Sequence, residues 1–243
     1  MMSTNILVLA AGSVATNTYD SGYPTCLAEL DGVSLIERIV QNTCNISDAN
    51  YDFAILKKDA EIFHLDKVIK LLVPKASVTK IPETTMGSAC TALLAACKLP
   101  KDSPLLIVSA NELVDLDLSM VVNVFHQRNL DGGTLVFRSI HPRYSYVRLN
   151  RDDLVIEAVQ QRPISQHATV GVFWFKITED FVEAVKSTIR KNAVIADKFY
   201  VAPTFNELIL KQKRVGVFHL DVNKYRPLKT ERQVQQFEQM SSI

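Results

Sequence analysis

Short apolar runs and amphipathic segments alternate along the first half of the chain. Runs in which every position is apolar predict buried strands, whereas apolar residues spaced three and four apart predict helices that bury one face. The predicted strands are Ile6–Ala11, Phe53–Leu56, Ser77–Ile81 and Leu105–Val108, and the predicted helices are Val33–Asn42, Ala60–Leu72, Gly87–Cys97 and Leu118–Arg128. Strands that alternate with helices in this way predict an α/β fold with a parallel, doubly wound sheet.

The second half of the chain has a different pattern, with strands at short spacing joined by turns rich in Asp, Asn and Gly. We expect strands at Gly133–Arg138, Ser145–Leu149, Leu154–Ala158, Thr169–Phe175 and Val215–Leu220, and helices near Thr178–Lys191, near Pro203–Lys211 and from about Thr230. No repeat, low-complexity tract or linker interrupts the sequence. The sequence therefore predicts one domain over residues 1–243, with a mixed β region inserted into it.

Ligands of open α/β sheets bind beyond the carboxyl ends of the parallel strands. The predicted ends here are Ala10–Gly12, Ile81–Glu83 and Ser109–Glu112. Small residues at the first of these ends are typical of a nucleotide-binding turn. The loop from Gly12 to Tyr19 nevertheless has no Lys, no Arg and no second Gly, so the groups that usually hold phosphates are missing from it.

Composition narrows the classes of function. The 243 residues are 47% hydrophobic, and 27 basic against 26 acidic residues leave a net charge of +1. A chain of this size buries a full core without disulfides, and its charge provides no field for nucleic acid or an anionic membrane. The four cysteines form no Cys-x-x-Cys pair, and no apolar run reaches the length of a membrane span. We therefore expect a cytoplasmic protein that binds neither nucleic acid nor membrane.

Several short segments, taken in order, resemble the sugar-nucleotidyltransferase-like enzymes of the GT-A-type nucleotide-binding fold. The matching segments are Ala10-Ala11-Gly12, Tyr23-Pro24, Glu29–Gly32, Leu35–Glu37, Thr85–Ala89, His141-Pro142, Ser145–Val147, Ile164-Ser165, Ala168–Gly171, Phe199–Val201 and Asn206-Glu207. The closest branch by pattern is that of bacterial nucleotidyltransferases of capsule or surface-polysaccharide modification. The resemblance implies a three-layer α/β/α domain with a mainly parallel central sheet, a nucleotide-side half (1–130) and an acceptor-side half (131–243).

The positions that carry the chemistry of that family depart from its pattern one after another. The resemblance places the family's second loop glycine at Val14, its arginine at Thr16, its lysine at Thr25 and its magnesium-holding aspartate at Asn111. Its Glu-Lys pair falls on Gln160-Gln161, its Gly-Glu pair on Asp197-Lys198, and its Gly-Thr-Pro on Lys229-Thr230-Glu231. Transfer to the α-phosphorus of a nucleoside triphosphate needs charge neutralisation by magnesium and basic side chains. Replacement at so many positions predicts that transfer by the family's route is impaired.

What remains is a nucleoside-sized recess. The candidate nucleotide-binding residues are Ala10, Ala11, Gly12, Gly87, Ser88 and Asn111. Asn111 and Asp221 are the candidate metal ligands, with Asp115 and Asp117 as further carboxylates, and Arg138, Arg143, Arg148 and Lys198 are basic residues that could replace the missing ones. Magnesium is expected only if the protein is an active transferase.

Three functions therefore stay open. The first is an impaired or inactive homologue that binds a nucleotide or nucleotide-sugar and acts beside an active homologue, or by self-association, in nucleotide-sugar or surface-polysaccharide metabolism. The second is an active nucleotidyltransferase or glycosyltransferase with a rearranged site. The third is a structural protein whose cleft is closed.

Overall fold

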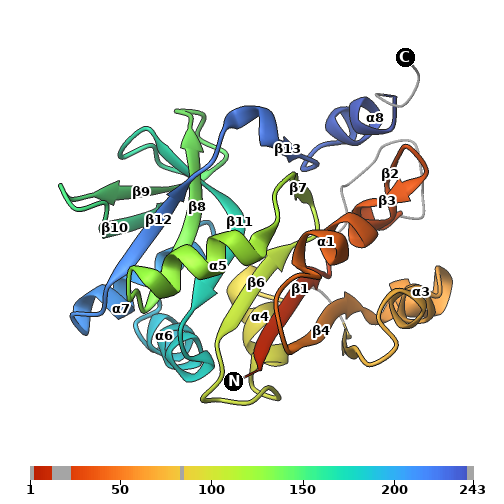
Figure 1. Cartoon of the computed structure of the whole chain (residues 1–243), viewed down its shortest axis with the longest axis horizontal. Coiled ribbons are helices and arrows are strands. Elements are labelled where there is room, and N and C mark those ends of the chain that lie inside the picture. Colours follow the sequence, from red (N-terminus) through yellow and green to blue (C-terminus); the bar gives the residue numbers. More distant parts are fainter. Residues whose placement is uncertain (1–2, 13–22, 83–84, 240–243) are drawn as a thin grey trace.

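The structure, a computed structural model, describes residues 3–12, 23–82 and 85–239 (Figure 1). Its strands are β1 (Thr4–Ala10), β2 (Glu29–Leu30), β3 (Val33–Ser34), β4 (Ala49–Leu56), β5 (Ser77–Ile81), β6 (Leu105–Ser109), β7 (Glu112–Val114), β8 (Gly132–Arg138), β9 (Ser145–Leu149), β10 (Val155–Gln160), β11 (His167–Phe175), β12 (Val215–His219) and β13 (Tyr225–Pro227). Its helices are α1 (Leu35–Thr43), α2 (Lys57–Ile62), α3 (Leu65–Leu72), α4 (Ser88–Ala96), α5 (Leu118–Gln127), α6 (Thr178–Arg190), α7 (Phe205–Leu210) and α8 (Glu231–Gln239), with short 3-10 turns at Thr25–Leu27, Ala202–Thr204 and Val222–Lys224.

A nine-stranded sheet runs through both halves of the described chain. Strands β5, β4, β1 and β6 are neighbours in that order, and each pair among them is parallel. Strand β11 joins this block antiparallel to β6, and it also pairs with β8 and β9. Strand β12 lies parallel to β8, and β10 pairs with β9 at the edge. The predicted α/β class with a mostly parallel central sheet is confirmed.

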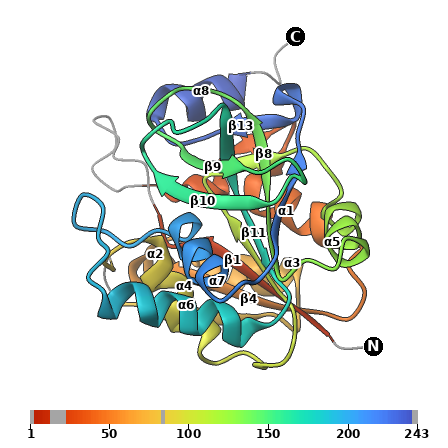
Figure 2. The same cartoon turned by 90° about the vertical axis from the view of Figure 1, so that its left-hand side faces the viewer.

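Alternate residues of the central strand β1 pack into two separate apolar clusters, one on each face of the sheet. Ile6 and Val8 point into the cluster that also contains residues of α1, α3 and α5. Leu7 points into the cluster formed with α4, α6 and α7. This alternation follows from the two-residue period of a strand. Figures 1 and 2 accordingly show α1 and α5 on one face of the sheet and α4 and α6 on the other.

Two predicted boundaries are wrong because local backbone geometry overrides the apolar period. The expected helix Ala60–Leu72 is divided into α2 and α3 by His64, whose φ of 51° is left-handed and ends a right-handed helix. The helix expected to begin at Val33 begins at Leu35, because the Ser34 hydroxyl accepts the Glu37 amide at 3.4 Å and caps it.

The short strands β2, β3, β7 and β13 were not predicted from the sequence. Each is two or three residues long, too short to show a period. The β13–β7 ladder pairs Tyr225 with Val114 and Pro227 with Glu112, and it brings the chain after residue 225 against the end of β6. This unforeseen ladder positions much of the candidate site.

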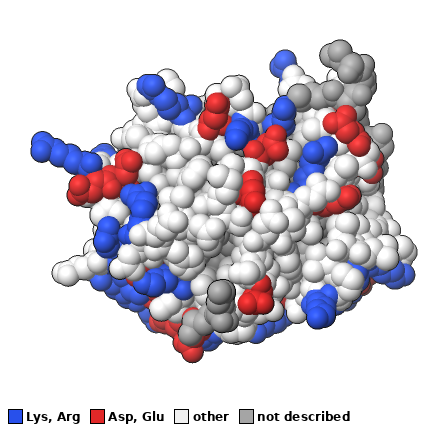
Figure 3. All heavy atoms as spheres, in the orientation of Figure 1, with Lys and Arg blue, Asp and Glu red and all other residues white. Residues whose placement is uncertain are grey.

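Among the described residues, no helix is long and apolar enough to cross a membrane. On the face drawn in Figure 3, basic and acidic side chains are interspersed around a broad uncharged area.

One carboxyl group in the core predicts a measurable pH dependence of stability. Asp59 in α2 is fully buried, and neither of its carboxylate oxygens has a hydrogen-bond partner. Burial raises the pKa of Asp59 above its ordinary 3.8, with Lys58 opposing the shift. The folded protein therefore binds more protons than the unfolded one between that value and the raised pKa, so this carboxyl lowers stability once it ionises above that window.

We expect Asp59→Asn to raise the free energy of unfolding at pH 7 by about 1 kcal/mol, because no charge is then buried. The gain shrinks as the pH falls towards the ordinary pKa of an aspartate, because the wild-type carboxyl then becomes protonated in both states. Urea denaturation of both proteins at pH 7 and pH 5 measures the difference in their free energies of unfolding. Asp66→Asn is the control, and it should lower the free energy of unfolding at pH 7, because a hydrogen bond from Lys80 stabilises the charged form of Asp66 and lowers its pKa. An Asp59→Asn variant less stable than wild type at pH 7 contradicts this account.

Candidate functional site

A cavity of about 270 Å³ opens beyond the carboxyl end of β6. It is surrounded by the residues after β6, the start of α4, strands β9, β10 and β11, the segment 200–202 and Lys229. The described residues that line it are Ser88, Ser109, Asn111, Glu112, Arg143, Ser145, Gln160, Gln161, Thr169, Val170, Gly171, Phe173, Tyr200, Val201, Ala202 and Lys229. The cavity thus lies at one of the predicted strand ends and between the two predicted halves.

Asn111 lies at the base of this cavity. Its backbone carbonyl accepts the Leu228 amide at 2.8 Å, and the neighbouring Ala110 amide donates to the Leu9 carbonyl of β1 at 2.9 Å. The side-chain Oδ1 of Asn111 is buried and accepts no hydrogen bond. A buried acceptor of this kind costs free energy unless a donor reaches it, and a ligand donor would reach this oxygen only after neighbouring side chains move.

Glu112 is the buried carboxylate of the cavity. It lies in the predicted strand end Ser109–Glu112, but no role for it is predicted from the sequence. The residue is 3% exposed. Its Oε2 accepts the Tyr225 hydroxyl at 2.5 Å and lies 3.2 Å from the Lys229 ammonium. Burial, and then the negative charge of Glu112, raises the pKa of Tyr225 well above its ordinary value, so Tyr225 stays protonated as the donor.

Gly171 makes room for this carboxylate. A Cβ at residue 171 would lie 2.0 Å from Glu112 Oε1 and 2.6 Å from Ser109 Oγ. Only a residue without a side chain allows β11 to pass so close to Glu112. The signal in the sequence is a glycine inside an apolar strand, which is typical of a close approach.

Two basic side chains line the cavity with the single carboxylate. Lys229 Nζ lies 3.2 Å from Glu112 and 5.6 Å from the centre of the Tyr144 ring. Arg143 Nε donates to His141 Nδ1 at 3.3 Å, and Arg143 is in no ion pair among the described residues. The ionisable side chains of the lining therefore sum to one positive charge. Such a balance favours an anionic ligand.

The segment 85–88 is held against the segment 198–200. The Phe199 amide donates to the Met86 carbonyl at 2.7 Å, and the Ala89 amide donates to the Phe199 carbonyl at 3.1 Å. Gly87 has a φ of 109°, and a Cβ there would lie 2.3 Å from the Phe199 carbonyl oxygen and 3.1 Å from the Lys198 Cβ. This contact places Ser88, the first residue of α4, at the cavity with the positive end of the helix dipole.

The structure brings together only part of the predicted nucleotide-binding set. Ser88 and Asn111 line the cavity, whereas Ala10, Ala11, Gly12 and Gly87 are not among its lining residues. Ala10 is 2% exposed, and no described residue beyond its chain neighbours has an atom within 4 Å of the place that a Cβ at Gly12 would take. The nucleotide-binding role of these six residues stays a prediction.

Of the positions at which the chain departs from the family pattern, only some lie at the cavity. Gln160 and Gln161 line the cavity, and Gln160 Oε1 accepts the Ser145 hydroxyl. Thr25 is buried in a 3-10 turn, 3% exposed. Val14 and Thr16 lie outside the described residues.

Magnesium does not fit the residues found here. Mg²⁺ takes six oxygen ligands in near-octahedral geometry and prefers anionic ones. The one carboxylate of the described lining is that of Glu112, whose Oε2 already contacts an ammonium, and the other side-chain oxygens of the lining are neutral amides and hydroxyls. Asp221, the other candidate ligand, is outside the lining and caps a 3-10 turn by accepting the Asn223 amide at 2.9 Å. In the described part of the chain, no group of three His, Cys, Asp or Glu residues could hold a metal ion.

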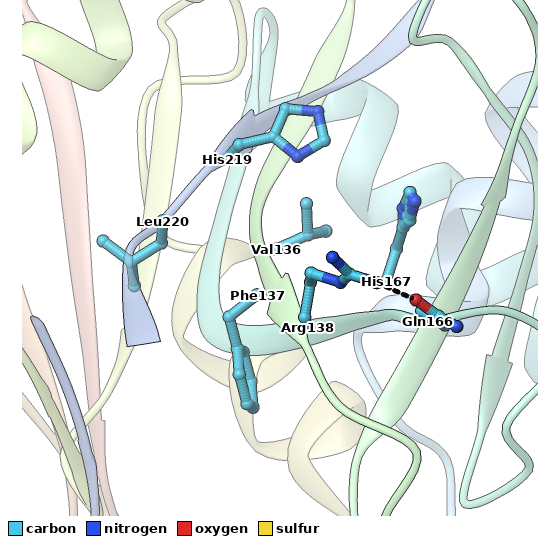
Figure 4. Close-up of a pocket in the computed structure, with 7 residues that line it drawn as sticks. All are labelled: Val136, Phe137, Arg138, Gln166, His167, His219 and Leu220. Carbon is cyan, nitrogen blue, oxygen red and sulfur yellow. Dashed lines mark hydrogen bonds between the residues drawn. The ribbon is translucent and has the colours of Figure 1, made fainter. Parts of the chain in front are cut away.

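A second cavity, of about 490 Å³, lies on the sheet at β8, β11 and β12 (Figure 4). Its polar lining residues are Arg138, Gln166, His167 and His219, and Arg138 donates to Gln166 Oε1 at 2.7 Å. It lies at the carboxyl ends of the parallel pair β8 and β12, away from the parallel block β5–β4–β1–β6, and it contains none of the predicted site residues except the basic candidate Arg138. The cavity around Asn111 is therefore the better candidate site.

Comparison with known proteins supports the fold. No protein-family model and no curated protein matches the sequence. Among solved structures, a nucleoside-diphosphate-sugar pyrophosphorylase from Vibrio cholerae RC9 aligns with a TM-score of 0.80 at 18% identity, over 96% of this chain and 99% of that one. A UDP-glucose pyrophosphorylase complexed with UDP-glucose aligns with a TM-score of 0.75 at 13% identity, over 98% of each chain.

A candidate glucose-1-phosphate thymidylyltransferase from Bacillus anthracis, in complex with sucrose, aligns with a TM-score of 0.71 at 16% identity, over 99% of this chain and 96% of that one. These likenesses confirm a sugar-nucleotidyltransferase-like fold for the chain. At identities this low, the likenesses establish the fold only, and the activity has to be argued from the residues of the site.

Proposed function

We propose that this protein binds a nucleotide or nucleotide-sugar without normal transfer activity. It would act as a catalytically impaired binding or partner protein in nucleotide-sugar or surface-polysaccharide metabolism, beside an active homologue or by self-association. The observation that carries the proposal is the ion pair between Glu112 and Lys229 at 3.2 Å. It leaves the base of the cavity without a carboxylate free to hold magnesium.

Three further features support the proposal. The fold is shared with proteins described as acting on nucleotide-sugars, one of them in complex with UDP-glucose. The cavity is lined by the basic side chain of Arg143 and by amide and hydroxyl side chains, which suit a hydroxylated, anionic ligand. At about 270 Å³ it is near the lower end of ordinary ligand pockets, so it suits a small ligand or part of a larger one.

The alternative is an active nucleotidyltransferase or glycosyltransferase with a rearranged site. Arg143 and Lys229 favour it, because basic side chains can neutralise developing negative charge in the place of a metal. The two functions differ in turnover rather than in binding, and a single assay separates them.

The test measures pyrophosphate release from CTP, UTP, ATP, GTP and dTTP with glucose 1-phosphate and magnesium, while calorimetry measures binding of the matching monophosphates and UDP-glucose. We expect binding without turnover above the protein-free rate. An active UDP-glucose pyrophosphorylase assayed in parallel is the positive control. Turnover within about 100-fold of that enzyme, less than the usual cost of one lost transition-state donor, would establish the active alternative. Absence of binding by every nucleotide would reject both and leave the structural protein.

A further inference from the structure

The backbone fixes Lys229 next to Glu112. Strand β13 pairs with β7 from Tyr225 to Pro227, and the Leu228 amide then donates to the Asn111 carbonyl at 2.8 Å. The Lys229 amide donates to Gln233 Oε1 of α8 at 3.0 Å. The side chain of Lys229 therefore extends from a backbone segment that hydrogen bonds hold on both sides, and this places it within reach of Glu112.

The Lys229 ammonium lies between groups that stabilise a positive charge. Glu112 is 3% exposed, the Lys229 side chain is 29% exposed, and the Tyr144 ring lies 5.6 Å from Nζ. Carboxylate and aromatic faces both stabilise a positive charge. A divalent ion at Glu112 would have to displace this ammonium or stay beside it against its repulsion.

We infer that the Lys229 ammonium is a built-in cation that takes the place of a divalent metal, so that this cleft binds its anionic ligand independently of metal. For the identity of the ligand, the phosphate of a nucleotide or nucleotide-sugar, the inference rests on the proposed function. Arg143 supplies the positive charge that remains after Lys229 and Glu112 neutralise each other.

The decisive experiment uses Mn²⁺ alone as the probe, followed by calorimetry on the full chain without nucleotide. Wild type should show no saturable binding up to about 1 mM, the weak end of protein sites for hard cations. Lys229→Asp places a second carboxylate beside Glu112 and the Asn111 oxygen, so it should bind Mn²⁺ at least about 10-fold more tightly. Lys75→Asp is the matched control, because it makes the same charge change at an exposed residue outside the cavity lining and should behave as wild type.

A second arm keeps the inference testable if Lys229→Asp does not fold. The nucleotide that binds best is titrated in EDTA into wild type, Lys229→Arg and Lys229→Met. We expect Lys229→Arg to stay within about 3-fold of wild type and Lys229→Met to bind about 10- to 100-fold more weakly, since a charged hydrogen bond is lost.

The outcomes separate this inference from the proposed function. Saturable Mn²⁺ binding by wild type at micromolar concentrations, or equal nucleotide affinity of Lys229→Met and wild type, overturns the inference. If no nucleotide binds, the proposed function fails, while the Mn²⁺ comparison still decides whether Lys229 excludes a metal.

Discussion

Gly171→Ala should lower the free energy of unfolding by about 3 kcal/mol. The added methyl would lie 2.0 Å from Glu112 Oε1, so the carboxylate must move and its contacts with Tyr225 and Lys229 are disturbed. Overpacking costs about 1–3 kcal/mol, and disturbance of a buried ion pair adds to it. Urea denaturation followed by the fluorescence of Trp174 measures the change.

Gly12→Ala is the matched control for that variant. In the part of the chain that the structure describes, no residue beyond the chain neighbours of Gly12 has an atom within 4 Å of the position that the added Cβ would take. The same chemical change should therefore alter stability by less than about 1 kcal/mol, and a reduced entropy of the unfolded chain acts in its favour. Equal losses for the two variants would mean that Gly171 is not needed for the packing of Glu112.

Glu112→Gln should destabilise the protein by about 2 kcal/mol. The amide keeps an acceptor for the Tyr225 hydroxyl but removes the charge that faces Lys229. Because Lys229 is 29% exposed, solvent screens part of the loss, and the cost falls below that of a fully buried pair.

A double-mutant cycle isolates the charge interaction. In a Lys229→Met background, Glu112→Gln should cost about 1 kcal/mol less than in wild type, because no ammonium is left without its partner. Lys75→Met serves as the control background, since Lys75 is exposed and outside the cavity. Additive losses in the Lys229→Met background would show that the two charges do not interact.

Much of the fold follows from the apolar period alone. The run at Leu105 forms β6, because a buried parallel strand is apolar almost throughout. Ser77–Ile81 forms the edge strand β5 with the predicted bounds, and buried and exposed residues alternate towards its carboxyl end. The break at His64 could not be predicted, since it depends on a left-handed residue that the apolar spacing does not show. The β13–β7 ladder was equally hidden, because it joins residues about 110 positions apart through three-residue strands.

The candidate site, like the fold, is predictable from the sequence only in part. Asn111 can be predicted because it follows an apolar strand at the edge where ligands bind, and Ser88 can be predicted through the family resemblance. Lys229 stands out in the sequence only as a replaced position, Glu112 is located only as part of the predicted strand end Ser109–Glu112, and Tyr225 carries no signal of its own. Their association is tertiary, created by the ladder that places residue 229 beside residue 112. Sequence spacing therefore locates the edge of the site but not its charges.

The central claim is that the cleft binds a nucleotide without a metal. Its most direct test is the dissociation constant of the best-binding nucleoside triphosphate, measured by calorimetry once in EDTA and once with excess Mg²⁺. We expect the two constants to agree within about 3-fold, because Lys229 takes the place of a metal ion beside Glu112 and Arg143 supplies the remaining positive charge. Binding that tightens by 100-fold or more with Mg²⁺, a gain of about 2.7 kcal/mol, would contradict the account.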